Sequence, residues 1–151
     1  MKFWVTIHKF VAAKEDDRDD TKVYIRTTGK EYDKIIGSGD LIVVREAGSG
    51  SRDGIVNFGR VFGDFISDDS IVSDKKYYKG FFNTKSLCGI CRISDKVLVS
   101  QKKLDSIIRE KFNKGVFPTV PGGIYEISGD EFKAIFDYWL YKEQDEKDNI
   151  R

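Results

Sequence analysis

Two apolar runs joined by a glycine-rich turn constrain the fold of this chain most strongly. DLIVVRE (40–46) and IVNFGRVF (55–62) have the apolar, β-branched composition of strands, and AGSGSRDG (47–54) separates them. Strands joined by a short turn of this composition pair as antiparallel neighbours. The sequence therefore predicts a β-hairpin in the middle of the chain. Backbone amides of such a loop can also hold a phosphate, with Arg52 at the tip, but a hairpin turn is the simpler interpretation.

Further elements are indicated on both sides of the hairpin. Runs of β-branched or alternating apolar residues predict additional strands, and these are 3–11, 23–28, 87–93 and 96–99. Amphipathic segments predict short helices at 30–40 and 103–112. Segment 64–85 is polar and aromatic, and we expect it to be a long connection, which in a packed domain usually has a functional purpose.

A final helix carries the clearest local signal. Ser128 is followed three residues later by Glu131, which is the spacing of a capping box. Behind this box, apolar residues repeat at helical spacing and predict a buried stripe, which consists of Phe132, Ile135, Phe136, Trp139 and Leu140.

The order of elements predicts an α+β fold. We expect a curved, barrel-like mixed β-sheet flanked by two or three short helices. A chain of 151 residues is the size of one ordinary domain, and we place that domain at residues 1–140. The charged segment 141–151 is expected to be a tail or the start of a linker.

The charge balance limits what the surface can bind. The 26 basic and 25 acidic side chains nearly cancel, so any nucleic-acid footprint must be local. No apolar run approaches the roughly 20 residues of a membrane span, and the opening residues lack the pattern of a signal peptide. We therefore expect a cytoplasmic protein with no membrane partner.

Catalytic templates are missing from the sequence, which argues against an enzyme. There is no phosphate-binding GxxxxGK[ST] loop, no GxSxG and no HExxH. The single histidine, His8, lies in an apolar strand, where a structural role is the commoner case. The acidic run 15–20 reads as a solvated loop, and the lone pair Cys88 and Cys91 reads as small core residues. We expect no cofactor and no metal.

The loop SDKKYYKGFF (73–82) is the strongest functional signal. It combines four aromatic rings with three lysines, and Lys85 and Arg92 follow it. Aromatic faces stack on nucleobases, and lysines bind phosphates without reading sequence. The alternative is that the rings anchor a long connection to the core while the lysines extend into solvent. Phe81 and Phe82 are expected to be mostly core.

The order of these motifs resembles the EVE and YTH domains of the PUA-like superfamily. The resemblance rests on the aromatic-rich first strand, the GD-led strand GDLIVV, the small-residue turn and the return strand GIVNFGRV, and it spans residues 1 to about 140. YTH domains follow their hairpin with an aromatic-Lys-Gly-x-Phe pattern, which YKGFF (78–82) matches. The resemblance implies a compact curved sheet that binds modified nucleic acid.

The resemblance also suggests individual roles. In YTH domains the aromatic before Lys-Gly is a wall of a cage around N6-methyladenine, which implies Tyr78 as one wall, Tyr77 as its neighbour and Tyr24 as a second wall. These walls are usually tryptophans in YTH domains, whereas this chain has Trp4 and Trp139 elsewhere. Trp4 is a core residue or a pocket floor. The residues expected to contact the nucleic-acid backbone are Lys75, Lys76, Lys79, Arg52 and Arg26.

The expected function is non-catalytic recognition of a modified base, N6-methyladenine in DNA being favoured over RNA, by flipping the base into this pocket. EVE-like and YTH-like folds also occur as N-terminal readers of McrB-type restriction systems, so a tethered motor or nuclease is a further expected partner. Two alternatives remain open. One is a PUA-like or ASCH-like domain that binds or processes RNA or a nucleoside, and the other is a plain interaction domain whose aromatics are buried.

Overall fold

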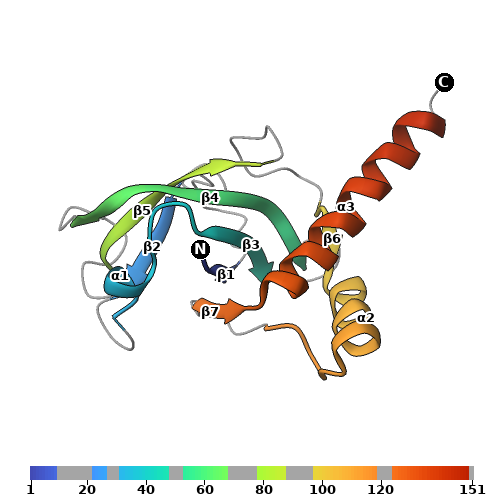
Figure 1. Ribbon diagram of the computed structural model, residues 1–151, viewed down its shortest axis with the longest axis horizontal. Helices are drawn as coiled ribbons and strands as arrows, with labels where there is room; N and C mark the ends of the chain where they lie inside the picture. Colours follow the sequence, from blue (N-terminus) through green and yellow to red (C-terminus); the bar gives the residue numbers. More distant parts are fainter. Residues whose placement is uncertain are drawn as a thin grey trace.

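The structure is a mixed β-sheet with three helices, α1, α2 and α3 (Figure 1). This computed structural model describes residues 1–9, 22–26, 31–47, 53–67, 78–87, 97–118 and 124–149. Within these ranges it does not describe the side chains of His8, Lys9, Tyr24, Arg26, Ala47, Tyr78, Lys79 and residues 143–149. The strands are β1 (Phe3–Lys9), β2 (Lys22–Arg26), β3 (Leu41–Ala47), β4 (Gly54–Ser67), β5 (Tyr78–Ser86), β6 (Val99–Ser100) and β7 (Ile124–Ile127).

The sheet has the order β2-β5-β4-β3-β1-β7, and β6 pairs with the start of β4. β1 and β3 are parallel, whereas the remaining pairs are antiparallel, so the sheet is mixed. The order runs from one edge to another without closing. The expected α+β class with a curved mixed sheet is confirmed, and the sheet is open. The predicted hairpin is confirmed as the antiparallel β3–β4 pair.

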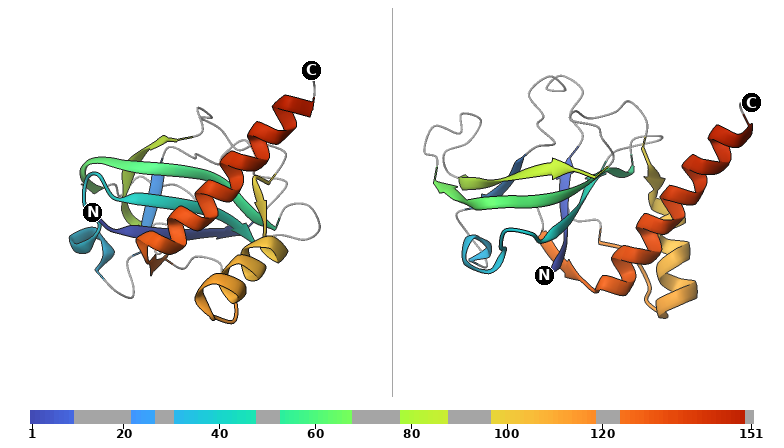
Figure 2. Two further views of the ribbon diagram at one scale, coloured as in Figure 1. Left: turned by 45° about the vertical axis from the view of Figure 1, so that its right-hand side comes forward. Right: turned by 45° about the horizontal axis from the view of Figure 1, so that its top comes forward.

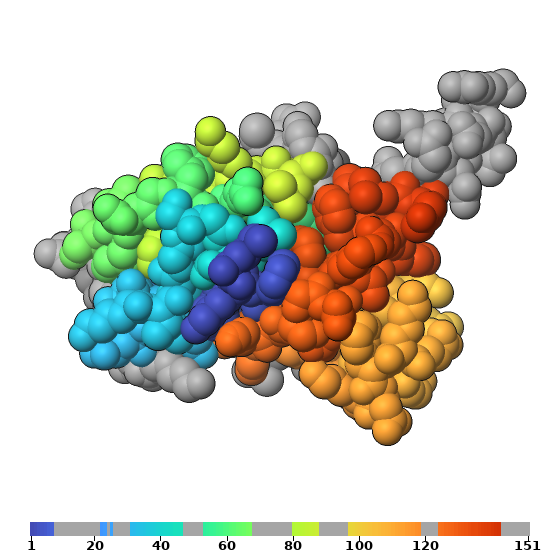
Figure 3. Space-filling model, viewed as in Figure 1, coloured from blue at the N-terminus to red at the C-terminus, as the bar shows by residue number. Residues whose placement is uncertain are grey.

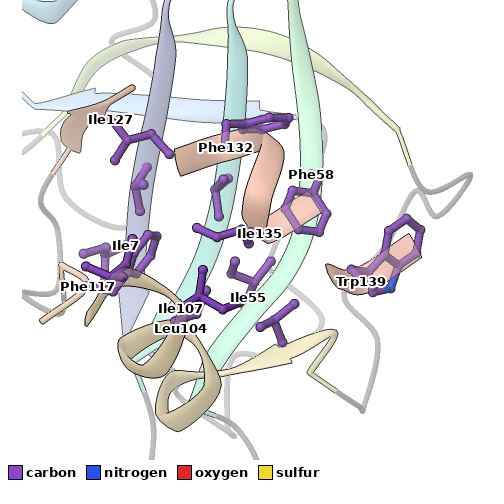
Figure 4. Packing of buried hydrophobic residues seen from close by; sticks show 14 residues of the cluster. Ile7, Ile55, Phe58, Leu104, Ile107, Phe117, Ile127, Phe132, Ile135 and Trp139 are labelled. Atoms are coloured by element: carbon purple, nitrogen blue, oxygen red, sulfur yellow. The ribbon is translucent and has the colours of Figure 1, made fainter. Parts of the chain in front are cut away.

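Helices α2 (Gln101–Phe112) and α3 (Gly129–Asn149) cover one face of the sheet, at the end where β4 begins (Figures 1 and 2). The first hydrophobic cluster fills the space between this face and the two helices. Phe58 of β4 packs edge-to-face against Phe132 and Phe136 of α3, with ring centroids 5.9 and 5.0 Å apart. Figure 4 shows side chains of the sheet and of both helices pointing toward one another in this cluster.

A second hydrophobic cluster lies on the other face, which the short helix α1 (Tyr32–Ile35) covers. Ile42 and Val44 of β3, Val61 of β4 and Phe82 of β5 are buried in it. Neighbouring residues of one strand therefore serve opposite clusters, as the alternation of side chains in a strand requires. Both faces of the central strands are buried, which explains their continuous apolar sequence.

The predicted capping box of α3 is confirmed. Ser128 Oγ accepts a hydrogen bond from the Glu131 amide at 3.0 Å, and Glu131 Oε1 accepts one from the Ser128 amide at 3.1 Å. The predicted stripe is buried or half-buried behind the box, except that Leu140 is 44% exposed. The helix does not end at Leu140 but continues to Asn149, so most of the segment expected as a tail is helical (Figure 1).

Two other expectations need correction. Segment 64–85, expected to be a connection, contains the end of β4 and most of β5. The segment 96–99, expected to be a full strand, contributes only Val99 to the two-residue strand β6. The cysteine pair and the acidic run 15–20 lie outside the described residues. None of the helices in the described ranges is long and apolar enough to span a membrane.

Candidate nucleic-acid interface

The β2–β5 pair brings the two expected wall residues onto neighbouring strands. Tyr24 of β2 is the register partner of Phe81, and Arg26 is the partner of Tyr78, with a register shift between Ile25 and Arg26. Tyr24 and Tyr78 are therefore two pair positions apart along the outermost pair of the sheet. Their side chains are not described, so the cage that they are expected to form stays a prediction.

Most of the other candidate residues lie either in β2 and β5 or outside the described residues. Arg26 and Lys79 lie in β2 and β5, and their backbone alone is described. The remaining candidates lie outside the described residues, and these are Tyr77, Lys75, Lys76 and Arg52. Their roles stay predictions.

Trp4 is the candidate whose side chain the structure places. It is 2% exposed in the second hydrophobic cluster, and its indole Nε1 donates a hydrogen bond to Asp40 Oδ2 at 3.0 Å. Its ring meets Tyr32 edge-to-face at 6.0 Å between centroids. Trp4 is thus a core residue with a satisfied indole nitrogen, and a second role as a pocket floor stays a prediction.

Asp40 organises the turn that precedes β3. Its carboxylate also accepts hydrogen bonds from the Gly37 amide and the Lys2 amide, each at 2.9 Å. Burial favours a higher pKa, but these hydrogen bonds and that of Trp4 outweigh burial and hold the pKa of Asp40 below its ordinary value. The GD-led motif is therefore explained by a buried carboxylate that joins β1 to the start of β3. Gly39, at φ +94°, provides the left-handed backbone of this turn.

Phe81 and Phe82 are confirmed as buried residues, 8% and 2% exposed. The Phe82 ring packs against Phe65 in the second cluster at 5.5 Å between centroids. On the opposite face, Lys22 Nζ lies 4.8 Å from the centroid of Phe81. Two of the four rings of segment 73–82 are thus packed in the sheet, as expected.

The structure also shows a group of basic and aromatic residues on β4 and β5 that the sequence pattern did not predict. Arg60 pairs with Lys85 across the two strands, and exposed Phe62 lies under the Lys85 ammonium. The alternation of Arg60 and Phe62 in FGRVF could have indicated a shared face, but the pairing with Lys85 depends on long-range register. Across the described part of the chain, no three His, Cys, Asp or Glu side chains gather where they could hold a metal ion.

Known structures share this fold at low sequence identity. The YTH domain of Mmi1 in complex with RNA matches with a TM-score of 0.61 at 9% identity, over 96% of this chain and 81% of that one. The YTH domain of Pho92 in complex with m6A matches with a TM-score of 0.59 at 15% identity, over 91% and 82%. A hypothetical protein from Leishmania major gives 0.58 at 12% identity, over 95% and 97%.

No protein-family model and no curated protein matches the sequence. At identities of 9 to 15%, the structural matches show a shared fold. The chain therefore has a YTH-like fold, as its motif order indicated.

Proposed function

We propose that this chain is a non-catalytic binding domain that recognises a modified base in nucleic acid at the β2–β5 edge. The observation that carries the proposal is the register that sets Tyr24 and Tyr78 two pair positions apart on neighbouring strands. Similar folds that were solved with RNA and with m6A support the class of ligand. Tyr24 and Tyr78 would be the walls, with Tyr77 next to them.

The energetics require more than the two walls. Stacking a base on an aromatic ring contributes roughly 1 to 3 kcal/mol, and extruding a base from a duplex costs a few kcal/mol. The free energy of stacking on two rings therefore about offsets the free energy of extruding the base. Contacts to phosphate must supply the net affinity, and the lysines and arginines of the surrounding segments suit that role.

Selectivity for the methyl group needs its own explanation. Burying one methyl contributes about 0.8 kcal/mol, which is a few-fold in affinity. A close-fitting pocket, together with easier extrusion of a base whose pairing the methyl weakens, would raise that preference. We favour N6-methyladenine because the YKGFF pattern matches the YTH cage sequence.

We propose that the nucleic acid is DNA. The domain would present it to a motor or nuclease to which it is joined, as in McrB-type systems. RNA is the second candidate, and the Mmi1 complex with RNA favours it. A single-stranded ligand would avoid the cost of extrusion altogether.

The test is fluorescence-anisotropy binding to matched oligonucleotides that carry adenine, N6-methyladenine, cytosine or 5-methylcytosine, each as duplex DNA, single-stranded DNA and RNA. Tyr78→Ala is the test variant, and Tyr141→Ala is the control because Tyr141 is 74% exposed on α3. We expect a preference for one modified oligonucleotide that Tyr78→Ala removes and Tyr141→Ala keeps. Equal binding to all bases, unchanged by Tyr78→Ala, would overturn the reader proposal, and turnover of a nucleoside would favour the processing alternative.

A further inference from the structure

The face of the sheet that carries α2 and α3 is only partly covered by these helices. Helix α3 packs over Phe58, whereas β4 and β5 continue beyond the helices and reach the surface (Figures 2 and 3). Arg60 and Phe62 alternate with Val61, which is buried on the opposite face with its partner Thr84. Arg60 and Phe62 therefore lie on the face of the sheet where the helical cover ends.

Two cations on this uncovered face are placed directly opposite each other. Arg60 and Lys85 are register partners on adjacent antiparallel strands, and both are exposed. Among the described residues, neither side chain forms an ion pair. Like charges at opposed positions of a sheet destabilise it. The chain thus accepts an electrostatic cost at this pair, and an anion bound between the two side chains would remove it.

An exposed aromatic ring adjoins the two cations. Phe62 is 42% exposed, and Lys85 Nζ lies 5.1 Å from its ring centroid. Its register partner is Asn83, which is neutral. The acidic residue Asp64 falls in the bulge between Phe62 and Ile66, outside the paired register. The paired positions therefore present two positive charges and one apolar ring without an acidic neighbour.

We infer that the patch formed by Arg60, Phe62 and Lys85 binds a single-stranded segment of nucleic acid that flanks the recognised base. Arg60 and Lys85 contact phosphates, and a base stacks on Phe62. An acidic peptide would match the cations but would leave the ring without a stacking partner, so a nucleic-acid strand fits the patch better. The identity of the partner rests on the proposed function.

The patch and the candidate base site share strand β5, which sets the length of strand needed to reach both. Tyr78 and Lys85 are seven residues apart in β5, which spans on the order of 20 Å. A strand that covers this distance fits the site size of roughly 4 to 16 nucleotides that domains binding single-stranded nucleic acid have. A 5-mer with a central modified base fills the base site alone, whereas a 15-mer also reaches the patch.

The experiment measures binding of single-stranded 15-mers and 5-mers, with and without N6-methyladenine, across a salt titration. Phe62→Ala is expected to weaken binding of modified and unmodified 15-mers alike, by about tenfold, and to leave their ratio unchanged. Arg60→Gln is expected to reduce the slope of log affinity against log salt by about 0.7 for one lost phosphate contact. Neither variant should change 5-mer binding. Lys102→Gln is the control, because Lys102 is exposed on α2.

The outcomes separate this inference from the reader proposal. If Tyr78→Ala removes selectivity while Arg60→Gln and Phe62→Ala leave 15-mer binding unchanged, the patch is overturned and the reader stands. If no modified base is preferred but both patch variants weaken 15-mer binding, the reader is overturned and the patch stands. Retained nucleic-acid binding together with weaker binding of a poly-glutamate peptide in both variants would reassign the patch to acidic proteins. A melting temperature for Arg60→Gln at or above that of the native chain excludes unfolding as the cause of weaker binding.

Discussion

The indole Nε1 of Trp4 donates a hydrogen bond to Asp40 Oδ2 at 3.0 Å, and this bond joins two residues that are 36 positions apart. Both residues are buried, Trp4 on β1 and Asp40 immediately before β3. Because β1 and β3 pair in parallel, a specific link between Trp4 near the start of β1 and the residue before β3 helps to set their register. The bond also fixes the Trp4 ring within the second hydrophobic cluster.

Replacement of Asp40 by asparagine is expected to lower the free energy of unfolding by about 2 kcal/mol. The carboxylate accepts three hydrogen bonds, and an amide would turn a donor toward at least one of those donors. Urea denaturation measures the loss. Asp64→Asn is the control because Asp64 is exposed. A midpoint for Asp40→Asn equal to that of the control would show that the three bonds contribute nothing to stability.

The pKa of Asp40 also predicts how stability depends on pH. Its folded pKa lies below the ordinary value of 3.8, so its stabilising contribution is complete above that pH and is lost as pH falls through the folded pKa. As pH falls from about 3.8 through the folded pKa, the native chain should therefore lose stability more steeply than Asp40→Asn does. Denaturation at several pH values tests this difference. Parallel curves for the two proteins would contradict the assignment.

Local signals in the sequence predicted the elements that depend on neighbouring residues. Ser128 and Glu131 formed the capping box because both partners lie within one turn of helix. The β3–β4 hairpin was also predictable, because a short turn leaves its strands little choice of partner. The spacing of Ser128 and Glu131 identified the box, and the apolar composition of 40–46 and 55–62 identified the strands of the hairpin.

The features that the sequence did not predict depend on pairing between strands that are far apart in the chain. β5 has too many lysines and polar residues to be recognised as a strand, and its pairing with both β2 and β4 makes it one. The contact between Phe62 and Lys85 depends on the β4–β5 register, and the bond between Trp4 and Asp40 depends on the pairing of β1 with β3. The motif alone predicts Tyr24 and Tyr78 as cage walls, and the structure adds that their strands are neighbours.

Buried Arg45 provides a prediction about the end of β3. Its Nη2 donates to Asp53 Oδ1 at 2.6 Å and its Nε donates to Gln101 Oε1 at 2.6 Å, whereas its buried Nη1 has no hydrogen-bond partner among the described residues. Removing half-buried Asp53 leaves the buried Arg45 charge without its ion-pair partner, whereas replacing that charge by an apolar side chain often costs little. Asp53→Ala should therefore lower the urea midpoint more than Arg45→Met does. The reverse order would show that the ion pair itself stabilises the junction between β3 and α2.

The two helix caps are expected to differ in strength. Ser128→Ala removes the hydroxyl that accepts from the Glu131 amide at 3.0 Å, and Glu131 itself is buried and accepts from Lys114 at 2.9 Å. Ser100 caps α2 through a single bond, from the Lys103 amide at 3.2 Å. Ser128→Ala should therefore cost about 1 to 2 kcal/mol and Ser100→Ala less. Thermal denaturation of both variants gives the comparison, and equal melting temperatures would mean that the Ser128 hydroxyl contributes no more than the Ser100 hydroxyl does.

Gly80 is expected to be essential for the β4–β5 pair beside Tyr78. A Cβ at this position would meet the Ile66 carbonyl oxygen and the Phe65 ring, and that carbonyl belongs to the paired strand, so it cannot move without disturbing the register. Gly80→Ala should therefore lower stability by about 2 kcal/mol or more and weaken binding at the neighbouring candidate site. Gly37→Ala is the control, because a Cβ there has no neighbour within 4 Å. Urea denaturation and oligonucleotide binding measure the two effects. If Gly80→Ala has the same urea midpoint and the same oligonucleotide affinity as Gly37→Ala, the close approach of β4 to β5 does not explain the glycine of the Tyr-Lys-Gly-Phe pattern.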